Sequence, residues 1–456
     1  MEQCSKEYIA GYIERAKKAQ EAFEKMSQEE TDAAVMAVAK VVHDNAEFLA
    51  EIAVEETGMG NVPDKTIKNK MKAKIIWNSL KGKKSKGIIA RDEHTGITEI
   101  AKPVGVVAAI TPCTNPTVTP MSNAMFALKG GNAIIITPHN LAVRSSGKTI
   151  EMINAELAKL GMPEHLVQII GNKSRENTGN LIAAADVVIA TGGMGMVKAA
   201  YSSGRPALGV GAGNVQCIID RDADLKDAVP KIITGRAFDN GIICSAEQTV
   251  ICPEDMLKEV LAEFEKCGAY VVKTQEEKEA LTTAVFEEGA MNRHAIGQSA
   301  ADIGKLARIG IPDEAKVILA RADGAGGKDI LSKEKMCPVL AVYTYQDFKE
   351  AVEIARENLE TEGKGHSVSL HSGTVENIEY AGTELCVSRF LVNQVCASSA
   401  GGSFHNGLAP TNTLGCGTWG NNSISENLTM KHLINVSRIA YYMPDNHIPT
   451  EEELWC

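Results

Sequence analysis

Five short apolar runs, separated by helical stretches, follow Gly105 in the first half of the chain. They are Val106–Ile110, Ala133–Ile136, Val167–Ile170, Val187–Ala190 and Val215–Ile219. Their hydrophobicity is continuous rather than alternating, which is typical of parallel strands that helices cover on both faces. The pattern predicts a doubly wound α/β unit, and ligands of such a unit bind at the carboxyl ends of the strands.

A second α/β series follows the first. Its apolar runs start near Thr249 and continue at residues 317–319, 339–345 and 368–371. A chain of 456 residues is long enough to form two cores. We therefore predict a first domain over residues 1–234, a second domain over 235–425, and a C-terminal segment, 426–456, that returns to the first domain or to an oligomer interface.

The region before the first sheet has a different pattern. Ser27 and Glu30 have the spacing of a capping box, and helices are predicted up to about Leu80. Residues 87–102 then read as an alternating ribbon with a turn at 94–96, which predicts a hairpin. The exposed edges of a hairpin are suited to being covered by a partner subunit.

Composition argues against several classes of partner and site. The chain has 47 basic and 58 acidic residues and a net charge of -11, so neither nucleic acid nor a membrane surface is an expected partner. An anionic substrate or cofactor then needs a local basic or N–H-rich pocket. No apolar run approaches the roughly 20 residues of a membrane-spanning helix, and the N-terminus does not resemble a signal peptide. The 11 cysteines include no CxxC pair. We therefore expect no metal site, no disulfide framework and a cytoplasmic location.

A glycine-rich turn, Thr191-Gly192-Gly193, lies between a predicted strand and a predicted helix. Glycines at this position let the backbone approach a phosphate at a helix N-terminus. The spacing is not GxGxxG, so a tight strand-to-helix turn explains the residues equally well.

Cys244 follows the glycine-containing turn Asp239-Asn240-Gly241. The next four residues, 245–248, are compatible with a helix, and a cysteine before a helix can be exposed with a lowered pKa. Such a cysteine is a candidate nucleophile. The alternative is a buried structural cysteine, which is how the other cysteines are interpreted.

Two polar residues follow or precede predicted strands. Asn115 comes just after a strand and is suited either to stabilising an oxyanion or to capping the next helix. Glu334 precedes the strand that starts near Pro338 and is either a site residue or a solvated surface carboxylate.

Taken together and in this order, these segments resemble the aldehyde dehydrogenase superfamily. Asp239-x-Gly241-x-x-Cys244 matches the nucleophile frame of that family, and Glu56-Thr57-Gly58 matches a signature in its N-terminal helical region. The resemblance implies a doubly wound cofactor-binding domain, an α/β catalytic domain and an oligomerisation hairpin. It therefore also implies a homo-oligomer, either a dimer or a dimer of dimers. It also implies that Cys244 is the nucleophile, that Asn115 holds the oxyanion, and that Glu334 holds the nicotinamide ribose.

The resemblance also implies where the cofactor binds. The expected contacts are Thr111, Pro112, Thr137, Pro138, His139, Arg144, Thr191, Gly192, Gly193, Gly209, Gly211, Glu334 and His366. Many NAD-preferring members carry a glutamate in the segment that is 137–140 here. Its absence favours NADP, with NAD still possible, and Arg144 or Ser145 would contact the 2′-phosphate. The alternative is that His139 and Arg144 only line a surface loop.

A further departure from the family pattern concerns the acyl acceptor. Hydrolytic members carry a general-base glutamate in a segment that is 208–214 here, and this stretch has no acid. Without such a base a thioester on Cys244 waits for a better nucleophile than water, which indicates the branch that acylates coenzyme A. Residues 413–423 resemble that branch as well. His366 is a candidate for positioning the thiol or the substrate, or else a packed residue.

Within that branch, residues 101–105, 190–198, 231–236 and 423–427 are most similar to members that interconvert succinyl-CoA and succinate semialdehyde. Candidates for substrate recognition are Ser245, Arg236 and His405. Three alternatives remain open: an acylating dehydrogenase for acetaldehyde, propionaldehyde or butyraldehyde, a hydrolytic semialdehyde dehydrogenase, and a non-catalytic filament-forming scaffold.

Overall fold

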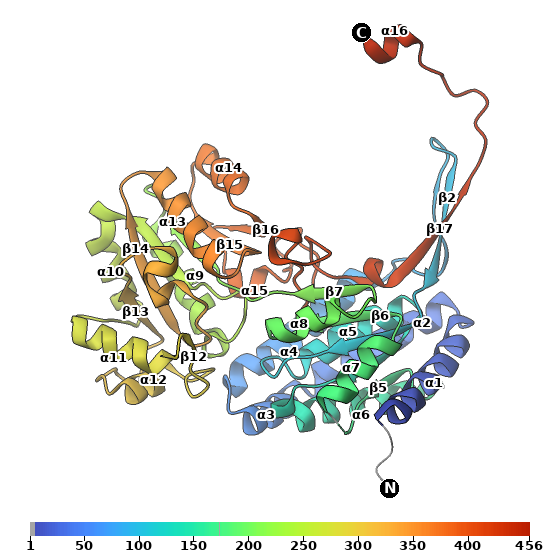
Figure 1. Ribbon diagram of the computed structural model, residues 1–456, viewed down its shortest axis with the longest axis horizontal. Coiled ribbons are helices and arrows are strands. Elements are labelled where there is room, and N and C mark those ends of the chain that lie inside the picture. Colours follow the sequence, from blue (N-terminus) through green and yellow to red (C-terminus); the bar gives the residue numbers. More distant parts are fainter. Residues whose placement is uncertain (1–4, 173) are drawn as a thin grey trace.

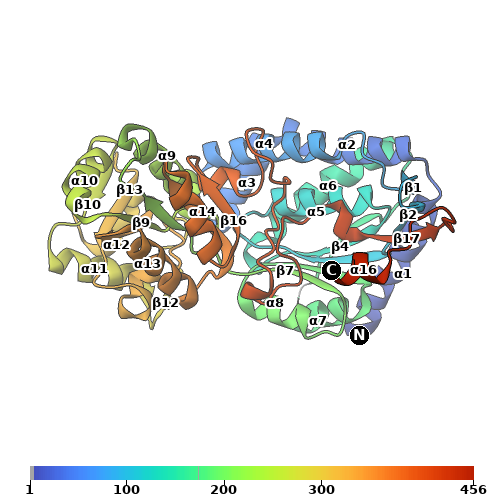
Figure 2. The same cartoon turned by 90° about the horizontal axis from the view of Figure 1, so that it is seen from above.

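The computed structural model describes residues 5–172 and 174–456. Two lobes lie side by side, each built around its own parallel β-sheet, and a thin arm leaves the first lobe and leads into a C-terminal tail (Figures 1 and 2). This arrangement confirms the α/β class that the apolar runs predict.

Four helices precede the first sheet, as predicted. They are α1 (Ser5–Glu24), α2 (Gln28–Asp44), α3 (Ala46–Thr57) and α4 (Val62–Leu80). The Ser27–Glu30 capping box is present at the start of α2, where each residue's side chain accepts from the other's backbone N–H. A glycine in the left-handed region, Gly58 at φ 66°, ends α3.

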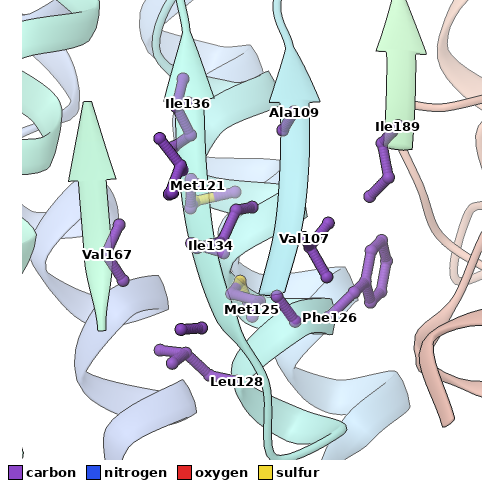
Figure 3. Close-up of a cluster of buried hydrophobic side chains, with 14 of the residues drawn as sticks. Val107, Ala109, Met121, Met125, Phe126, Leu128, Ile134, Ile136, Val167 and Ile189 are labelled. Carbon is purple, nitrogen blue, oxygen red and sulfur yellow. The ribbon is translucent and has the colours of Figure 1, made fainter. Parts of the chain in front are cut away.

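The first lobe contains a five-stranded parallel sheet in the order β5-β4-β3-β6-β7. The strands are β3 (Val106–Ile110), β4 (Ala133–Thr137), β5 (Val167–Ile169), β6 (Val187–Thr191) and β7 (Ala207–Val210). The helices are α5 (Val118–Lys129), α6 (Val143–Lys159), α7 (Arg175–Ala184) and α8 (Met194–Tyr201). Every residue of α5 is buried, because the helix lies between the sheet and the N-terminal helices. Met121 and Phe126 of α5 pack against Val107 and Ile134 of the sheet (Figure 3).

The second lobe contains a seven-stranded parallel sheet in the order β10-β13-β14-β9-β8-β15-β16. The strands are β8 (Gln216–Ile219), β9 (Thr249–Pro253), β10 (Ala269–Val271), β13 (Val317–Arg321), β14 (Val339–Tyr345), β15 (Gly365–His371) and β16 (Val387–Val392). The helices are α9 (Leu225–Ala237), α10 (Leu257–Lys266), α11 (Gln275–Val285), α12 (Ala300–Ala307), α13 (Phe348–Thr361), α14 (Val375–Glu384) and α15 (Cys396–Ser399), and a small ribbon pairs β11 (Phe286–Glu287) with β12 (Ala290–Met291).

Strand β8 corrects one prediction. The run at 215–219 was expected to continue the first sheet, but β8 pairs with β15 and β9 of the second. Helix α9 packs on the same sheet, because Val229 and Ile232 share a core cluster with Ile219. The chain therefore passes from one sheet to the other between β7 and β8, ahead of residue 235.

The arm is a three-stranded antiparallel sheet in the order β1-β2-β17. The predicted hairpin is formed by β1 (Gly87–Asp92) and β2 (Ile97–Pro103), and β17 (Ile434–Ala440) covers the second edge of β2. A tail beyond β17 carries a short helix, α16 (Glu451–Trp455).

Among the helices of the described residues, none combines the length and apolarity needed to cross a membrane. Likewise, no group of three or more His, Cys, Asp or Glu side chains within 5–172 and 174–456 is arranged to hold a metal ion.

Candidate active site

A cavity of about 480 Å³ lies where the two lobes meet. It brings together most of the residues that the sequence singled out. Thr111, Pro112, Asn115, His139, Thr191, Gly192, Gly193, Gly211, Cys244 and Glu334 all line it. The remaining predicted site residues, Thr137, Pro138, Arg144, Gly209, Ser245, Arg236, His366 and His405, are not among its lining residues.

A strained turn delivers Cys244 to the cavity. Asp239 and Asn240 both adopt φ 53°, and Gly241 follows at φ 72°. The left-handed region is unfavourable for side chains other than glycine, so the turn persists only where its surroundings fix it. At Gly241 a Cβ would come within 2.8 Å of the Cys337 backbone, so glycine is required there for space as well as for conformation.

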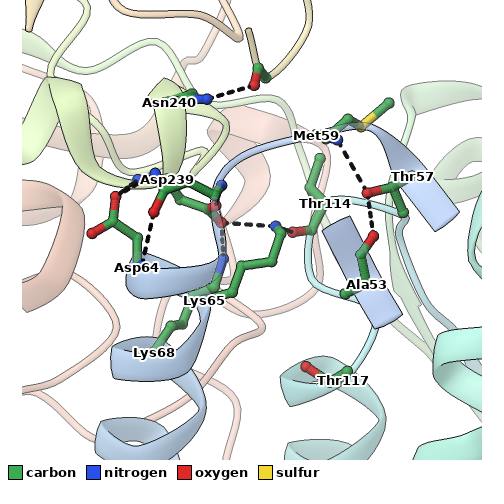
Figure 4. Close-up of polar contacts among 12 residues, drawn as sticks. Ala53, Thr57, Met59, Asp64, Lys65, Lys68, Thr114, Thr117, Asp239 and Asn240 are labelled. Atoms are coloured by element: carbon green, nitrogen blue, oxygen red, sulfur yellow. Dashed lines mark hydrogen bonds and ion pairs between the residues drawn. The ribbon is translucent and has the colours of Figure 1, made fainter. Parts of the chain in front are cut away.

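Asp239 supplies that fixation, because its buried carboxylate ties the turn to helix α4 (Figure 4). It lies 3.0 Å from Lys65 Nζ, forms a second ion pair with Lys68, and accepts from the Asn61 N–H at 3.1 Å. Its own N–H donates to Asp64 at 2.8 Å. Burial would raise the pKa of Asp239, but the two ammonium groups hold it below its ordinary value.

The thiol of Cys244 is strongly desolvated. Its pKa is raised to about 12, mainly by burial and also by the Glu334 carboxylate, whereas the guanidinium of Arg389 opposes this shift. Residues after Cys244 form a turn, closed by a 2.9 Å bond from Ala246 N–H to the Ile243 carbonyl, rather than a helix. The predicted helix and the predicted lowering of the pKa are therefore wrong, since no helix N-terminus faces the sulfur.

Arg389, on strand β16, is a cation that is electrostatically coupled to the thiol. Its guanidinium is buried and donates to four neutral oxygens, Ser367 Oγ at 3.1 Å, His366 O at 2.7 Å, Gly415 O at 2.8 Å and Asn427 Oδ1 at 3.2 Å, and it also bonds to the Cys416 side chain. No carboxylate of the described residues forms an ion pair with it, so its charge is available to favour the thiolate. Sequence gave no signal for this role, because 145 positions separate residues 244 and 389.

Gly213 packs directly against the backbone of Cys244. A Cβ there would lie 1.8 Å from the Cys244 carbonyl oxygen, so only glycine fits. The segment that carries a general base in hydrolytic relatives thus presents backbone and not a carboxylate to the nucleophile.

Asn115 shares the cavity with Cys244. Its side-chain oxygen is buried without a hydrogen-bond partner among the described residues, and helix α5 begins after Thr117. Asn115 therefore does not cap α5, and the alternative interpretation is excluded. The amide Nδ2 of an asparagine in the same cavity as the nucleophile is a donor suited to stabilising an oxyanion.

Glu334 lies across the cavity from the first lobe. Its pKa is raised to about 8, mainly by burial and also by the nearby Glu362, whereas Arg236 opposes this shift. Arg236 was a candidate for substrate recognition. It is instead fully buried and donates to the carbonyls of Glu247, Lys335 and Cys337, so it holds the loop that carries Glu334 and does not reach the cavity.

The cofactor end of the cavity is made largely of backbone. Gly192 and Gly193 follow β6 and have open space where a Cβ would stand, and α8 begins directly after them. This cradle fits the phosphates of a dinucleotide at a helix N-terminus. Thr137 and Pro138 are buried beneath it, with Thr137 Oγ1 3.4 Å from Thr178 Oγ1. Gly209 is also behind the cavity, where its N–H donates to Tyr201 Oη at 2.8 Å.

The Glu56-Thr57-Gly58 signature has a structural role. The Glu56 carboxylate accepts from the backbone N–H groups of Arg144 and Ser145, at 2.6 and 2.7 Å, and so caps helix α6. The Arg144 guanidinium pairs with Glu55 at 2.5 Å, on the surface. A contact from Arg144 to a cofactor 2′-phosphate is thus not the arrangement present. Arg175, at the start of α7, lines the cavity instead and was missed by sequence reasoning.

The other predicted residues lie outside the cavity. His366 is fully buried, with Nδ1 3.0 Å from Ser367 Oγ, and burial holds its pKa well below its ordinary value. Ser245 donates to the Ala397 carbonyl at 2.9 Å and is buried. His405 is exposed on the loop after α15.

Comparisons with known proteins agree with this site. The model of the aldehyde dehydrogenase family matches residues 1–432. The chain is 54% identical over 447 residues to the succinate-semialdehyde dehydrogenase (acetylating) of Clostridium kluyveri, covering 98% of each chain. The chain therefore belongs to the aldehyde dehydrogenase family, and within it to the acylating enzymes.

Solved structures of acylating aldehyde dehydrogenases support the same family assignment. The acetylating aldehyde dehydrogenase of Geobacillus thermoglucosidasius superposes with a TM-score of 0.94 at 38% identity, covering 98% of each chain. An engineered glycolyl-CoA reductase with bound NADP+ superposes with a TM-score of 0.84 at 28% identity, covering 95% of this chain and 96% of that one. A nicotinamide dinucleotide and coenzyme A are accordingly the kinds of cofactor and acyl acceptor that this family site uses.

Proposed function

We propose that the chain converts succinate semialdehyde, coenzyme A and NADP+ into succinyl-CoA, NADPH and a proton, and that it catalyses the reverse reduction. The observation that carries the proposal is the contact of Gly213 with Cys244, which leaves no carboxylate from 208–214 to activate water. The substrate is taken from the Clostridium kluyveri relative, whose name specifies succinate semialdehyde.

The reaction begins with the thiolate of Cys244, which attacks the aldehyde carbon. Because burial raises the pKa of Cys244 to about 12, the charge of Arg389 is needed to favour the thiolate. The Asn115 side chain and the Cys244 backbone N–H hold the oxyanion. A bound nicotinamide cofactor would supply the hydride acceptor, and Glu334 would hold its ribose. The thioester on Cys244 is then released by the thiol of coenzyme A, which ionises far more readily than water.

A substrate panel tests this proposal. We expect kcat/KM for succinate semialdehyde to exceed that for butyraldehyde, because an anionic end group is recognised. Equal values would favour the second candidate, an acylating dehydrogenase for acetaldehyde, propionaldehyde or butyraldehyde. The joint presence of Asn115, Cys244 and Glu334 in one cavity argues against a non-catalytic scaffold.

NADP is the proposed cofactor, with NAD as the alternative. Residues 137–140 contain no glutamate to repel a 2′-phosphate, and Arg175 and His139 line the same end of the cavity. Titration of nicotinamide fluorescence measures this directly. Arg175→Ala should weaken NADPH binding about tenfold and leave NADH binding unchanged, whereas an equal loss for both cofactors would contradict a 2′-phosphate contact.

We also propose a homo-oligomer built through the arm. Strands β1 and β17 are the edge strands of its sheet, and Tyr442 and Trp455 on the tail are 89% and 78% exposed. Apolar side chains this exposed favour burial by a partner copy. Light scattering should show a dimer or larger for the full chain and a smaller species after deletion of 441–456.

We further propose a reducing, cytoplasmic location, because no disulfide joins cysteines of the described residues.

A further inference from the structure

Three lysines of helix α4 face the junction of the two lobes. Lys65, Lys68 and Lys72 follow one another at intervals of three and four residues, which places them on one side of the helix. The first two share one counter-charge, the buried carboxylate of Asp239 (Figure 4). One carboxylate therefore serves two ammonium groups, and the stripe as a whole carries an excess of positive charge.

Lys72 has no such partner. Its Nζ donates to the carbonyls of Gly401 at 2.8 Å and Thr411 at 3.3 Å, and no carboxylate of the described residues lies within ion-pair distance. An ammonium group has three N–H donors, so one remains after these two bonds. At Gly401 a Cβ would lie 2.6 Å from Nζ, so a glycine is needed for the lysine to reach this position.

The ammonium group adjoins a segment that lines the cavity of the nucleophile. Thr411, which accepts one of its bonds, immediately precedes Asn412, and Asn412 lines the cavity together with Cys244. Burial lowers the pKa of Lys72 to about 8, and its coupling to Cys244 opposes that shift. Lys72 is half-buried, so its cation is partly desolvated without a carboxylate partner among the described residues, and an anionic ligand would offset that cost.

We propose that Lys72 forms the subsite for the distal anionic group of the aldehyde substrate. The aldehyde carbon is at Cys244, and the carboxylate at the other end of a four-carbon semialdehyde is the missing counter-charge of the ammonium group. This inference rests on the proposed function. It replaces Arg236 and His405 with a lysine that has no carboxylate partner among the described residues and that bonds to the segment next to Asn412 of the cavity.

Steady-state kinetics with two aldehydes of similar length test the assignment. We expect Lys72→Met to lower kcat/KM for succinate semialdehyde about 10- to 100-fold, mainly through KM, and to leave kcat/KM for butyraldehyde nearly unchanged. Lys74→Met is the matched control, because Lys74 lies on the same helix and is exposed. Lys72→Gln retains donors for the two carbonyls and loses only the charge, so it serves if the methionine variant does not fold.

A second measurement needs no turnover. Succinate should slow the alkylation of Cys244 by iodoacetamide in the wild type and in Lys74→Met, but not in Lys72→Met or Lys72→Gln. An equal loss of activity for both aldehydes would overturn the assignment, because Lys72 would then serve the thiolate and not the substrate. Unchanged selectivity in the variants would overturn it too. Failure of the proposed function would look different from failure of the Lys72 assignment, since the wild type itself would then show no preference for succinate semialdehyde over butyraldehyde.

Discussion

The two ends of the active-site cavity are built in opposite ways. At the cofactor end, the lining is largely backbone at strand ends, with Gly192 and Gly193 before helix α8 and with the side chains of Arg175 and His139 beside them. At the thiol end, ionisable groups from distant parts of the chain converge: Cys244, Glu334 and Arg389 are all desolvated, and Cys244 is coupled to both of the others. Binding at the first end depends on local chain geometry, whereas reactivity at the second depends on a balance of buried charges.

Replacing the nucleophile should separate the two ends most clearly, because it should abolish turnover and leave cofactor binding intact. Cys244→Ala should reduce CoA-dependent turnover by about 10⁴-fold or more, because no other group forms the thioester. NADPH binding, measured by fluorescence, should stay as in the wild type, because the cofactor end does not use the sulfur. Substantial residual turnover would mean that the acyl group is carried elsewhere.

Removing the charge that fixes the nucleophile turn should have the next largest effect. Asp239→Asn leaves the ammonium groups of Lys65 and Lys68 without a counter-charge, and we expect the free energy of unfolding in urea to fall by about 3–5 kcal/mol. The pKa of Asp239 is below its ordinary value in the folded chain. The stabilisation is therefore complete above the ordinary carboxyl pKa and is lost as the pH falls through the lowered one. Asp255→Asn, which breaks an exposed pair with Arg221, should leave unfolding almost unchanged.

Asn115, the proposed donor to the oxyanion, should affect the rate of reaction and not the stability of the fold. Asn115→Ala should lower kcat by about 10²- to 10³-fold with little change in KM, because the lost hydrogen bond forms only as charge develops. Asn412→Ala is a control in the same cavity, since Asn412 donates its amide N–H to the Val118 carbonyl at 3.1 Å. Equal losses in both variants would point to altered cavity shape and not to oxyanion binding.

The smallest expected effect is that of changing Glu334. This residue is proposed to hold the cofactor ribose, and it is also coupled to the thiol of Cys244. Its carboxylate raises the pKa of Cys244, and its own pKa is about 8, so it carries charge mainly above that pH. Glu334→Gln should therefore speed alkylation of Cys244 a few-fold, roughly, at pH 9 and leave the rate at pH 7 nearly unchanged. Glu360→Gln, at an exposed ion pair, serves as the control. Slower alkylation at pH 9 would reverse the sign of the coupling and contradict the account.

The same contrast explains how far the sequence could be interpreted. Short-range patterns predicted the α/β class, the hairpin at 87–102, the turn at Thr191-Gly192-Gly193 and the frame around Cys244, because each depends on neighbouring residues. The sheet to which β8 belongs could not be predicted, since an apolar run carries no information about its pairing partners.

The electrostatic environment of Cys244 could not be predicted from the sequence either. The predicted lowering of the Cys244 pKa failed because the dominant effect is burial by segments far away in sequence. Arg236 and Lys72 illustrate the same point. As isolated basic residues they are equivalent in sequence, yet Arg236 is bound to carbonyls behind the Glu334 loop, whereas Lys72 donates to the segment next to Asn412 of the cavity.

The central claim is that the acyl group waits on Cys244 for coenzyme A. Rapid mixing with succinate semialdehyde and NADP+, followed at the nicotinamide absorbance without coenzyme A, tests it directly. The account predicts a burst of one NADPH per Cys244 that then stops, and sustained turnover once coenzyme A is added. Sustained turnover without coenzyme A would contradict it, because water would then be reaching the thioester past Gly213.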